Sequence, residues 1–135
     1  MNGLFYQKEV AEYTTYHLLR FYENGYVIYK KVTGSDKAYL SRELKSFAMV
    51  GHDVKGEPEF TFCGSFEDYG DVISCKVENQ IMDSSDTWAE KDVLSFRGKF
   101  NENGELELKK ISKRTKFEVD IKFLPTIDEV LMSEF

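Results

Sequence analysis

An arginine flanked by tyrosines offers the most specific chemistry in this sequence. Arg20 lies two residues before Tyr22, and Tyr29 follows across a predicted turn. A guanidinium donates hydrogen bonds in a fixed fork that matches a carboxylate or a phosphate, and phenol hydroxyls add further donors. If these side chains face the interior of the fold, they form a site for an anion. If Arg20 faces outward, its stem packs on the surface and its head is solvated, which is the interpretation we favour.

Other reactive residue types are sparse. The sequence has 2 histidines and 2 cysteines, and their spacing fits no zinc site, while a glycine-rich phosphate loop and a nucleophile elbow are both missing. His17 shares a predicted strand face with Leu19 and Phe21, where a histidine is usually structural. The acidic residues form no pair marked for acid and base roles. We therefore expect binding rather than enzymatic activity, with no metal and no cofactor.

Basic residues gather around the last predicted hairpin. Such a cluster usually forms a solvated edge that prevents pairing between molecules, although it is also suited to docking an acidic protein or a phosphate. The whole chain carries 24 acidic and 18 basic residues, a net charge of -6, which disfavours binding to nucleic acid. The cluster consists of Lys109, Lys110, Lys113, Arg114 and Lys116.

Predicted β-strands position these residues, because apolar side chains recur at every second position between glycine-containing turns. Asn24-Gly25 marks the clearest hairpin and places Glu23 opposite Tyr26. On that register one face holds Leu19, Phe21 and Ile28, and the other holds Leu18, Arg20, Tyr22, Val27 and Tyr29. The predicted strands are 3–6, 14–22, 26–32, 58–67, 72–78, 91–100, 105–111 and a last strand that alternates from Phe117 to Phe123 and ends at Pro125.

One segment follows a helical period instead. Leu40, Leu44 and Phe47 recur at helical spacing between Asp36, a plausible N-cap, and Gly51, so we predict a helix over 36–49. The tail 126–135 has the spacing of one or two helical turns that close one end of the fold. With 135 residues the chain has the size of a single domain, 1–135.

Sequential antiparallel strands with one apolar face each are typical of a meander. About eight of them, with the helix inserted between the third and fourth strands, can close into a barrel; an open sandwich is the alternative. Glycines in the repeated Gly-x-Phe phrases permit close approach where a strand bends. The phrases are Gly3-Leu4-Phe5, Gly64-Ser65-Phe66 and Gly98-Lys99-Phe100.

Together with the run from Leu19 to Gly25 and with Phe96-x-Gly98, these phrases make the chain resemble the small lipocalin-like barrels of the calycin group. The resemblance implies an up-and-down barrel with an internal cavity, often for an apolar ligand. Phe5 stands where many lipocalins carry tryptophan.

The interior of such a barrel is either a ligand pocket or a packed core. Cys75 is predicted to point inward and Cys63 outward, which excludes a disulfide between them. Trp88, in the loop 79–90, is placed to cap the barrel mouth or contact a ligand. The expected wall comprises Phe60, Phe62, Phe66, Ile73, Cys75, Val77, Phe96, Phe100, Leu106, Leu108, Phe117, Val119, Ile121 and Phe123, and the candidate ligand-binding residues are Arg20, Tyr22, Tyr29, Phe62, Cys75, Trp88, Phe96, Phe117 and Val119.

The leading hypothesis is a non-enzymatic binding protein that holds a small apolar or amphipathic ligand inside a barrel. The alternative is an interaction module, a small inhibitor or adaptor, that contacts a protein partner through the helix 36–49 or through an exposed aromatic face of the first hairpin. No apolar run is long enough to span a bilayer and the N-terminus lacks a secretory signal pattern, so we expect a cytoplasmic protein. The sequence does not indicate an oligomeric state.

Overall fold

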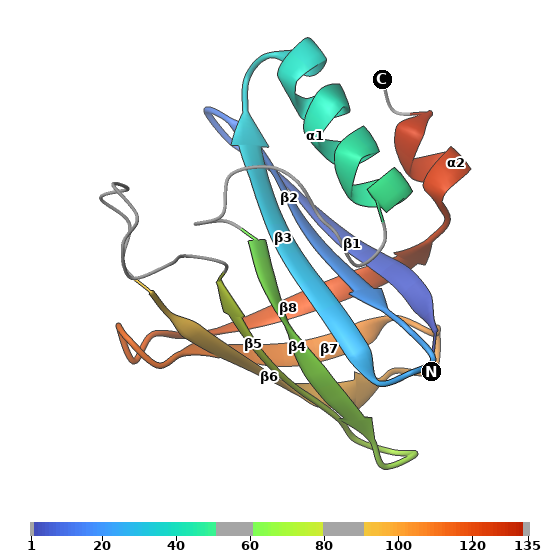
Figure 1. Ribbon diagram of the computed structural model, residues 1–135, viewed down its shortest axis with the longest axis vertical. Coiled ribbons are helices and arrows are strands. Elements are labelled where there is room, and N and C mark those ends of the chain that lie inside the picture. Colours follow the sequence, from blue (N-terminus) through green and yellow to red (C-terminus); the bar gives the residue numbers. More distant parts are fainter. Residues whose placement is uncertain (1, 51–60, 80–90, 134–135) are drawn as a thin grey trace.

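The computed structural model describes residues 2–50, 61–79 and 91–133, except for the side chains of residues 44–50 and 132. Consecutive strands pair antiparallel, and the last strand pairs with the first, which closes the barrel (Figure 1). The strands are β1 (Gly3–Val10), β2 (Thr14–Phe21), β3 (Tyr26–Gly34), β4 (Thr61–Asp68), β5 (Ile73–Asn79), β6 (Val93–Phe100), β7 (Leu106–Ser112) and β8 (Glu118–Thr126). The predicted meander barrel is therefore confirmed.

Two helices accompany the barrel, α1 (Lys37–Val50) between β3 and β4 and α2 (Asp128–Met132) after β8. The carboxylate of Asp36 accepts a hydrogen bond of 2.9 Å from the Ala38 N–H, so the predicted N-cap is confirmed. Both helices lie side by side against the outer face of β1–β3 (Figure 1). The tail therefore covers a side of the barrel, whereas we expected it to close one end.

The first hairpin differs from its predicted register by one residue. Its loop has three residues, because Tyr22 pairs with Tyr26 and Gly25 adopts a φ of +87°, as in a type I turn followed by a glycine bulge. Leu19 therefore pairs with Tyr29, and Phe21 with Val27. A shift of one residue turns every side chain of β3 to the other face, so Val27 and Tyr29 face the interior and Ile28 faces outward.

The β1–β3 sheet is consequently buried on both faces. Its inner face contributes to the barrel core, and its outer face forms a second core with the helices. That second core comprises Leu4, Tyr16, Leu18, Ile28, Val32, Leu40 and Leu131. This core also contains an ion pair, in which Nζ of Lys30 lies 3.0 Å from Oε2 of Glu43 in α1. The Lys30 side chain is 2% exposed and that of Glu43 is 14% exposed. The predicted exposed aromatic face of this hairpin is therefore wrong, since the helices bury it.

Two glycines permit the strands to coil tightly. A Cβ added to Gly64 would lie 1.9 Å from the carbonyl oxygen of Lys76, and one added to Gly98 would lie 1.8 Å from that of Glu107. Those oxygens belong to the neighbouring strands β5 and β7, so a side chain at either position would push two backbones apart. The expected close approach at these glycines is confirmed.

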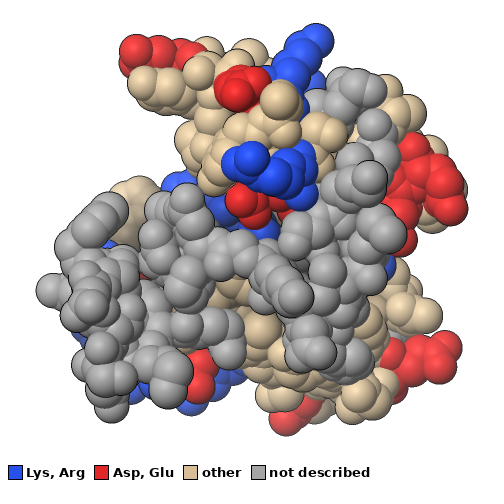
Figure 2. Space-filling view, turned by 45° about the horizontal axis from the view of Figure 1, so that its top comes forward, with Lys and Arg blue, Asp and Glu red and all other residues tan. Residues whose placement is uncertain are grey.

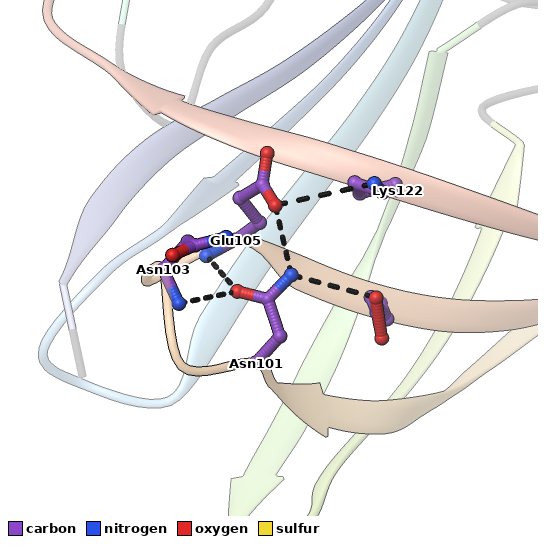
Figure 3. Close-up of polar contacts among 5 residues, drawn as sticks. Asn101, Asn103, Glu105 and Lys122 are labelled. Carbon is purple, nitrogen blue, oxygen red and sulfur yellow. Dashed lines mark hydrogen bonds and ion pairs between the residues drawn. The ribbon is translucent and has the colours of Figure 1, made fainter.

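We call the end of the barrel at which β3 leads into α1 the upper end, and the opposite end the lower end. At the lower end Asn101 fastens the turn between β6 and β7 (Figure 3). Its side-chain oxygen accepts hydrogen bonds from the backbone N–H groups of Asn103 and Glu105, at 2.9 and 3.0 Å. Its amide also donates to the Glu105 carboxylate at 2.8 Å. This end is therefore held by local side-chain to backbone bonds.

Aromatic rings fill the lower interior. Phe21 contacts Phe5 and Phe66 with ring centroids 5.8 and 5.0 Å apart, and Phe5 reaches Phe100 at 5.8 Å. Edge-on contacts of this kind stabilise a packed core. The lower half of the interior is therefore a core and not a ligand pocket.

Candidate functional site

Polar side chains replace the aromatic ones at the upper end of the interior. On four strands the inward-facing positions change from apolar to polar toward the upper end. Gln7 and Glu9 follow Phe5 in β1, His17 precedes Leu19 in β2, Lys31 follows Tyr29 in β3, and Lys110 follows Leu108 in β7. A strand directs every second residue to the same face. We call Gln7, Glu9, His17, Lys31 and Lys110 the polar wall.

His17 is the centre of this wall. Its Nδ1 lies 2.7 Å from the Tyr29 hydroxyl oxygen, and its Nε2 lies 3.3 Å from a carboxylate oxygen of Glu9. Burial lowers the pKa of His17 to about 4, with a further contribution from Lys110 and opposition from Glu9. The ring is therefore neutral at pH 7. It donates from Nε2 to Glu9 and accepts at Nδ1 from Tyr29, which satisfies all three groups.

Tyr29 joins the polar wall to the apolar core. Its ring packs against Phe62 and Phe96 with centroids 5.8 and 5.1 Å apart. Burial raises the pKa of Tyr29 well above its ordinary value, so the hydroxyl remains a donor. A buried phenol that is already bonded to His17 is poorly suited to act as a base or a nucleophile.

Lys110 leans over the same ring. Its Nζ lies 5.8 Å from the Tyr29 ring centroid, within the range of a cation–π contact. Burial lowers the pKa of Lys110, the positive charge of Lys31 lowers it further, and the carboxylates of Glu9 and Asp92 act against both. The partly buried Lys110 thus lies within electrostatic reach of the exposed Lys31 on another strand.

Apolar side chains share the upper interior with the polar wall. Val77 in β5 pairs with Leu94 in β6, and Val119 in β8 pairs with Lys110 in β7. Phe62, Val77 and Leu94 belong to the barrel core and Val119 packs against it; we call these four residues the apolar wall. Three of them lie on the neighbouring strands β4–β6, whereas Val119 lies between the polar strands β7 and β1. The upper interior therefore combines polar and apolar side chains, as expected of a site for an amphipathic molecule.

The strand pairing also opens at this end. β1 and β8 pair only at Leu4–Thr126, Phe5–Pro125 and Tyr6–Leu124 among the described residues, so Gln7–Val10 have no partner on β8. In Figure 1 β8 runs away from β1 above this seam. The polar wall residues Gln7 and Glu9 lie on the unpaired half of β1.

Asp92 anchors the turn between β7 and β8 at the upper end of the barrel. Its carboxylate accepts hydrogen bonds from the Ser112 hydroxyl at 2.5 Å and from the backbone N–H of Arg114 at 2.9 Å. Burial alone would raise the pKa of Asp92, but these bonds outweigh it and lower the pKa. The turn that connects β7 to β8 is thereby anchored to the start of β6, which fixes Lys110 and Val119 on either side of it.

The structure separates the predicted site residues into groups. Phe62, Cys75, Phe96 and Val119 lie in or against the barrel core, as predicted, and Tyr29 joins them because the register of the first hairpin differs from the predicted one. Cys75 and Cys63 are both free thiols, also as predicted, and burial raises the pKa of Cys75 to about 12. Of the expected wall, Phe60 lies outside the described residues, as does the candidate Trp88.

Three candidates do not line the interior. Arg20 on β2 and Tyr22 just after it face outward, and Arg20 forms an ion pair with Asp128 at the start of α2. Arg20 thus faces outward, the interpretation we favoured, but its head is not solvated, because the chain supplies a carboxylate to it. Phe117 precedes β8 and is 65% exposed; the turn with Lys116 at a φ of 62° turns it out of the alternation.

The basic cluster is also divided. Lys109 points outward beside Glu118 at 3.9 Å, whereas Lys110 points inward. Sequence reasoning assigned both to one solvated edge, although the alternation from Leu106 and Leu108 already indicated that Lys110 faces the interior. In the view of Figure 2, basic side chains stand beside acidic ones over the part of the molecule that the structure describes.

Surface grooves occur on the outer side of β4–β8. One of them has a volume of about 610 Å³ and is bordered by outward side chains, among them Arg97, Lys99, Glu107 and Asp120. Its mixed charges match those of ordinary cross-strand pairs on a solvated sheet face. Within residues 2–50, 61–79 and 91–133, no three His, Cys, Asp or Glu side chains gather as a metal site. Neither described helix is long and apolar enough to cross a bilayer.

Comparison of the chain with protein-family models, with curated proteins and with solved structures finds no match.

Proposed function

We propose that this protein is a non-enzymatic, lipocalin-like binding protein that holds a small apolar or amphipathic ligand in the upper interior of its barrel. The observation that carries the proposal is that polar and apolar side chains share the upper interior of a closed barrel. The up-and-down strand order supports the resemblance to lipocalin-like barrels, since such barrels enclose a single small ligand.

The filled lower half limits where the ligand lies. Phe21 and Phe123 are both fully buried, so a guest there would have to displace packed rings. In the upper half, Val119 and Lys110 are only partly buried and face each other across the β7–β8 pair. A ligand of modest size, seated on Phe62 and Tyr29, is what this space favours.

Binding is favoured over catalysis by the state of the polar groups. His17 uses both ring nitrogens on Tyr29 and Glu9, and the raised pKa of Tyr29 keeps its proton in place. In the polar wall, Gln7 has a buried side-chain oxygen without a hydrogen-bond partner among the described residues, an acceptor that suits a hydroxyl of a guest. The two free thiols, Cys63 and Cys75, support a reducing, cytoplasmic location.

Displacement of a neutral dye tests the proposal. Nile red should bind the purified protein with 1:1 stoichiometry and should be displaced by 1-decanol. Val119→Trp, which fills the space opposite Lys110, should abolish dye binding, whereas Leu124→Trp on the outer face of the same strand should not. Absence of binding to a folded wild-type protein, or equal binding by both variants, would refute the proposal.

A further inference from the structure

We propose that the outer face of β5–β7 binds a phosphorylated side chain on an extended segment of a partner protein. This surface lies outside the barrel, so the inference is independent of the proposed interior ligand. The juxtaposition that supports it is Arg97 on β6 directly opposite Lys109 on β7. Both side chains line a groove whose lining contains cations and hydroxyls but no carboxylate.

The groove is formed by outward side chains of three neighbouring strands. Cys75 and Phe96 are buried in the barrel core, so their neighbours along the chain point to the other face. The groove has a volume of about 470 Å³. Both described helices pack on the β1–β3 side of the barrel, so neither of them covers it (Figure 1). Its outward lining residues are Ser74 and Lys76 on β5, Ser95 and Arg97 on β6, and Lys109 and Ile111 on β7.

Arg97 and Lys109 form an unfavourable cross-strand pair. Like charges at directly opposed positions destabilise a sheet, because the two Cβ atoms are only about 5 Å apart. Arg97 forms no hydrogen bond or ion pair within the part of the chain that the structure describes. Lys109 lies 3.9 Å from Glu118, and both of those side chains are about half exposed, so that contact is weak. The repulsion between the two cations is therefore largely uncompensated within the chain.

Acidic side chains border the groove but do not line it. Asp120 lies opposite Lys109 on β8, and Glu67 lies opposite Ser74 on β4. An anion therefore gains most between Arg97 and Lys109, away from both carboxylates. A guanidinium donates two parallel hydrogen bonds to phosphate oxygens, and a lysine beside it adds a further donor. The half-buried Ser74, opposite Arg97 on β5, supplies a hydroxyl as well.

The charge of the groove favours a phosphate monoester over a single carboxylate. A phosphoryl group carries a charge of about −1.5 to −2 at pH 7 and has three acceptor oxygens. Lys76 pairs with Ser95 and is therefore diagonal to Arg97 across the β5–β6 pair, a separation that long side chains can bridge. Cations from three strands can thus contact the same phosphoryl group.

The neighbouring grooves favour an extended segment over a compact molecule. Lys76 also borders a groove of about 550 Å³ over β3–β6. Arg97 and Lys109 also border the groove of about 610 Å³ described above. The cationic groove is therefore the middle part of a continuous band across the sheet. Recognition of a phosphorylated side chain within a peptide by basic residues is a recurring mode of protein interaction.

An NMR titration of the isotope-labelled full chain tests the proposal. The probe is an octapeptide of alanine and glycine with one central phosphoserine, compared with the same peptide carrying serine or glutamate. The phosphopeptide should shift the backbone amide signals of Ser74, Ser95 and Arg97 and should bind about tenfold or more tightly than the other two peptides. Arg97→Gln and Lys109→Gln should each weaken its binding about tenfold. Lys37→Gln removes an exposed cation from α1 on the other side of the barrel and should leave binding unchanged.

Arg97→Gln removes one member of a repulsive pair, so its melting temperature should equal or exceed that of the wild type. Loss of binding is then separate from loss of folding, and Lys109→Gln tests the same site if Arg97→Gln fails to fold.

Several results would overturn the proposal. They are equal binding of the serine or glutamate peptide, no binding of the phosphopeptide to the folded wild type, and unchanged binding in Arg97→Gln and Lys109→Gln. A parallel loss in Lys37→Gln would assign the effect to general surface charge and would also overturn it. Free O-phosphoserine that binds as tightly as the phosphopeptide would overturn the partner segment as the occupant, in favour of a small phosphate ester.

Discussion

The Nδ1 atom of His17 lies 2.7 Å from the hydroxyl oxygen of Tyr29, and both side chains are buried at the upper end of the barrel. The ring of Tyr29 packs in the aromatic core, and Nε2 of His17 lies 3.3 Å from the Glu9 carboxylate. One neutral imidazole thus links the polar wall to the packed interior. The protonation state of His17 therefore determines whether the polar wall and the packed interior stay linked.

Acid should destabilise the protein through His17. The folded-state pKa of about 4 lies below the ordinary value of 6.5, so the unfolded chain binds the proton more readily and stability falls as the pH drops from about 6.5 to 4. The loss attributable to this residue is about 3 kcal/mol. Urea unfolding at several pH values should show a flatter dependence of stability on pH for His17→Gln than for the wild type. Parallel profiles for His17→Gln and wild type would contradict this assignment.

Removal of the Tyr29 hydroxyl should destabilise the fold. Tyr29→Phe leaves the Nδ1 of His17 buried without its donor, which costs about 1–3 kcal/mol in unfolding free energy. The ring contacts with Phe62 and Phe96 are preserved, so the effect isolates the hydrogen bond. Tyr69→Phe, at an exposed turn position, is the control and should change little. A neutral result for Tyr29→Phe would show that the hydroxyl is not needed by His17.

The ion pair between Lys30 and Glu43 should matter far more than a surface pair. Its Nζ and Oε2 atoms are 3.0 Å apart, with Lys30 2% exposed and Glu43 14% exposed. Removing one partner of a buried pair typically destabilises by about 3–5 kcal/mol, whereas replacing both with apolar residues is nearly neutral. Glu43→Gln should therefore lower the free energy of unfolding strongly, and Lys30→Met with Glu43→Leu should recover it. Lys91→Gln, which breaks an exposed pair, should cost less than about 1 kcal/mol.

The glycine at position 98 should not tolerate a methyl group. Gly98→Ala places a Cβ where the Glu107 carbonyl oxygen lies 1.8 Å away, so the β6 and β7 backbones must separate, at about 3 kcal/mol. Gly34→Ala meets only the Tyr39 side chain, at 3.1 Å, and that side chain can move. Thermal unfolding should show a large loss for Gly98→Ala and a small one for Gly34→Ala. Similar melting temperatures would show that the coiling of β6 is not fixed by this glycine.

The barrel was predictable because its signals are local: each hairpin shows period-two alternation of apolar residues and a turn that contains glycine. The register of the first hairpin was not, since Asn24-Gly25 suits a two-residue turn as well as the observed three-residue loop. The choice is made by burial of Val27 and Tyr29 in the core. Arg20 was similarly undetermined, because its partner Asp128 lies 108 residues away in the sequence. The inward direction of Lys110 follows from alternation alone and was obscured by the charged residues around it.

The most direct test of the ligand site is a set of intermolecular nuclear Overhauser effects between decanoate and methyl-labelled protein. The account predicts contacts from the decanoate chain to the methyl groups of Val119 and Leu94, with none to Leu106 in the packed lower interior. Contacts confined to Val72, which borders the outer groove, or an absence of contacts to Val119 and Leu94 at saturating decanoate, would contradict it.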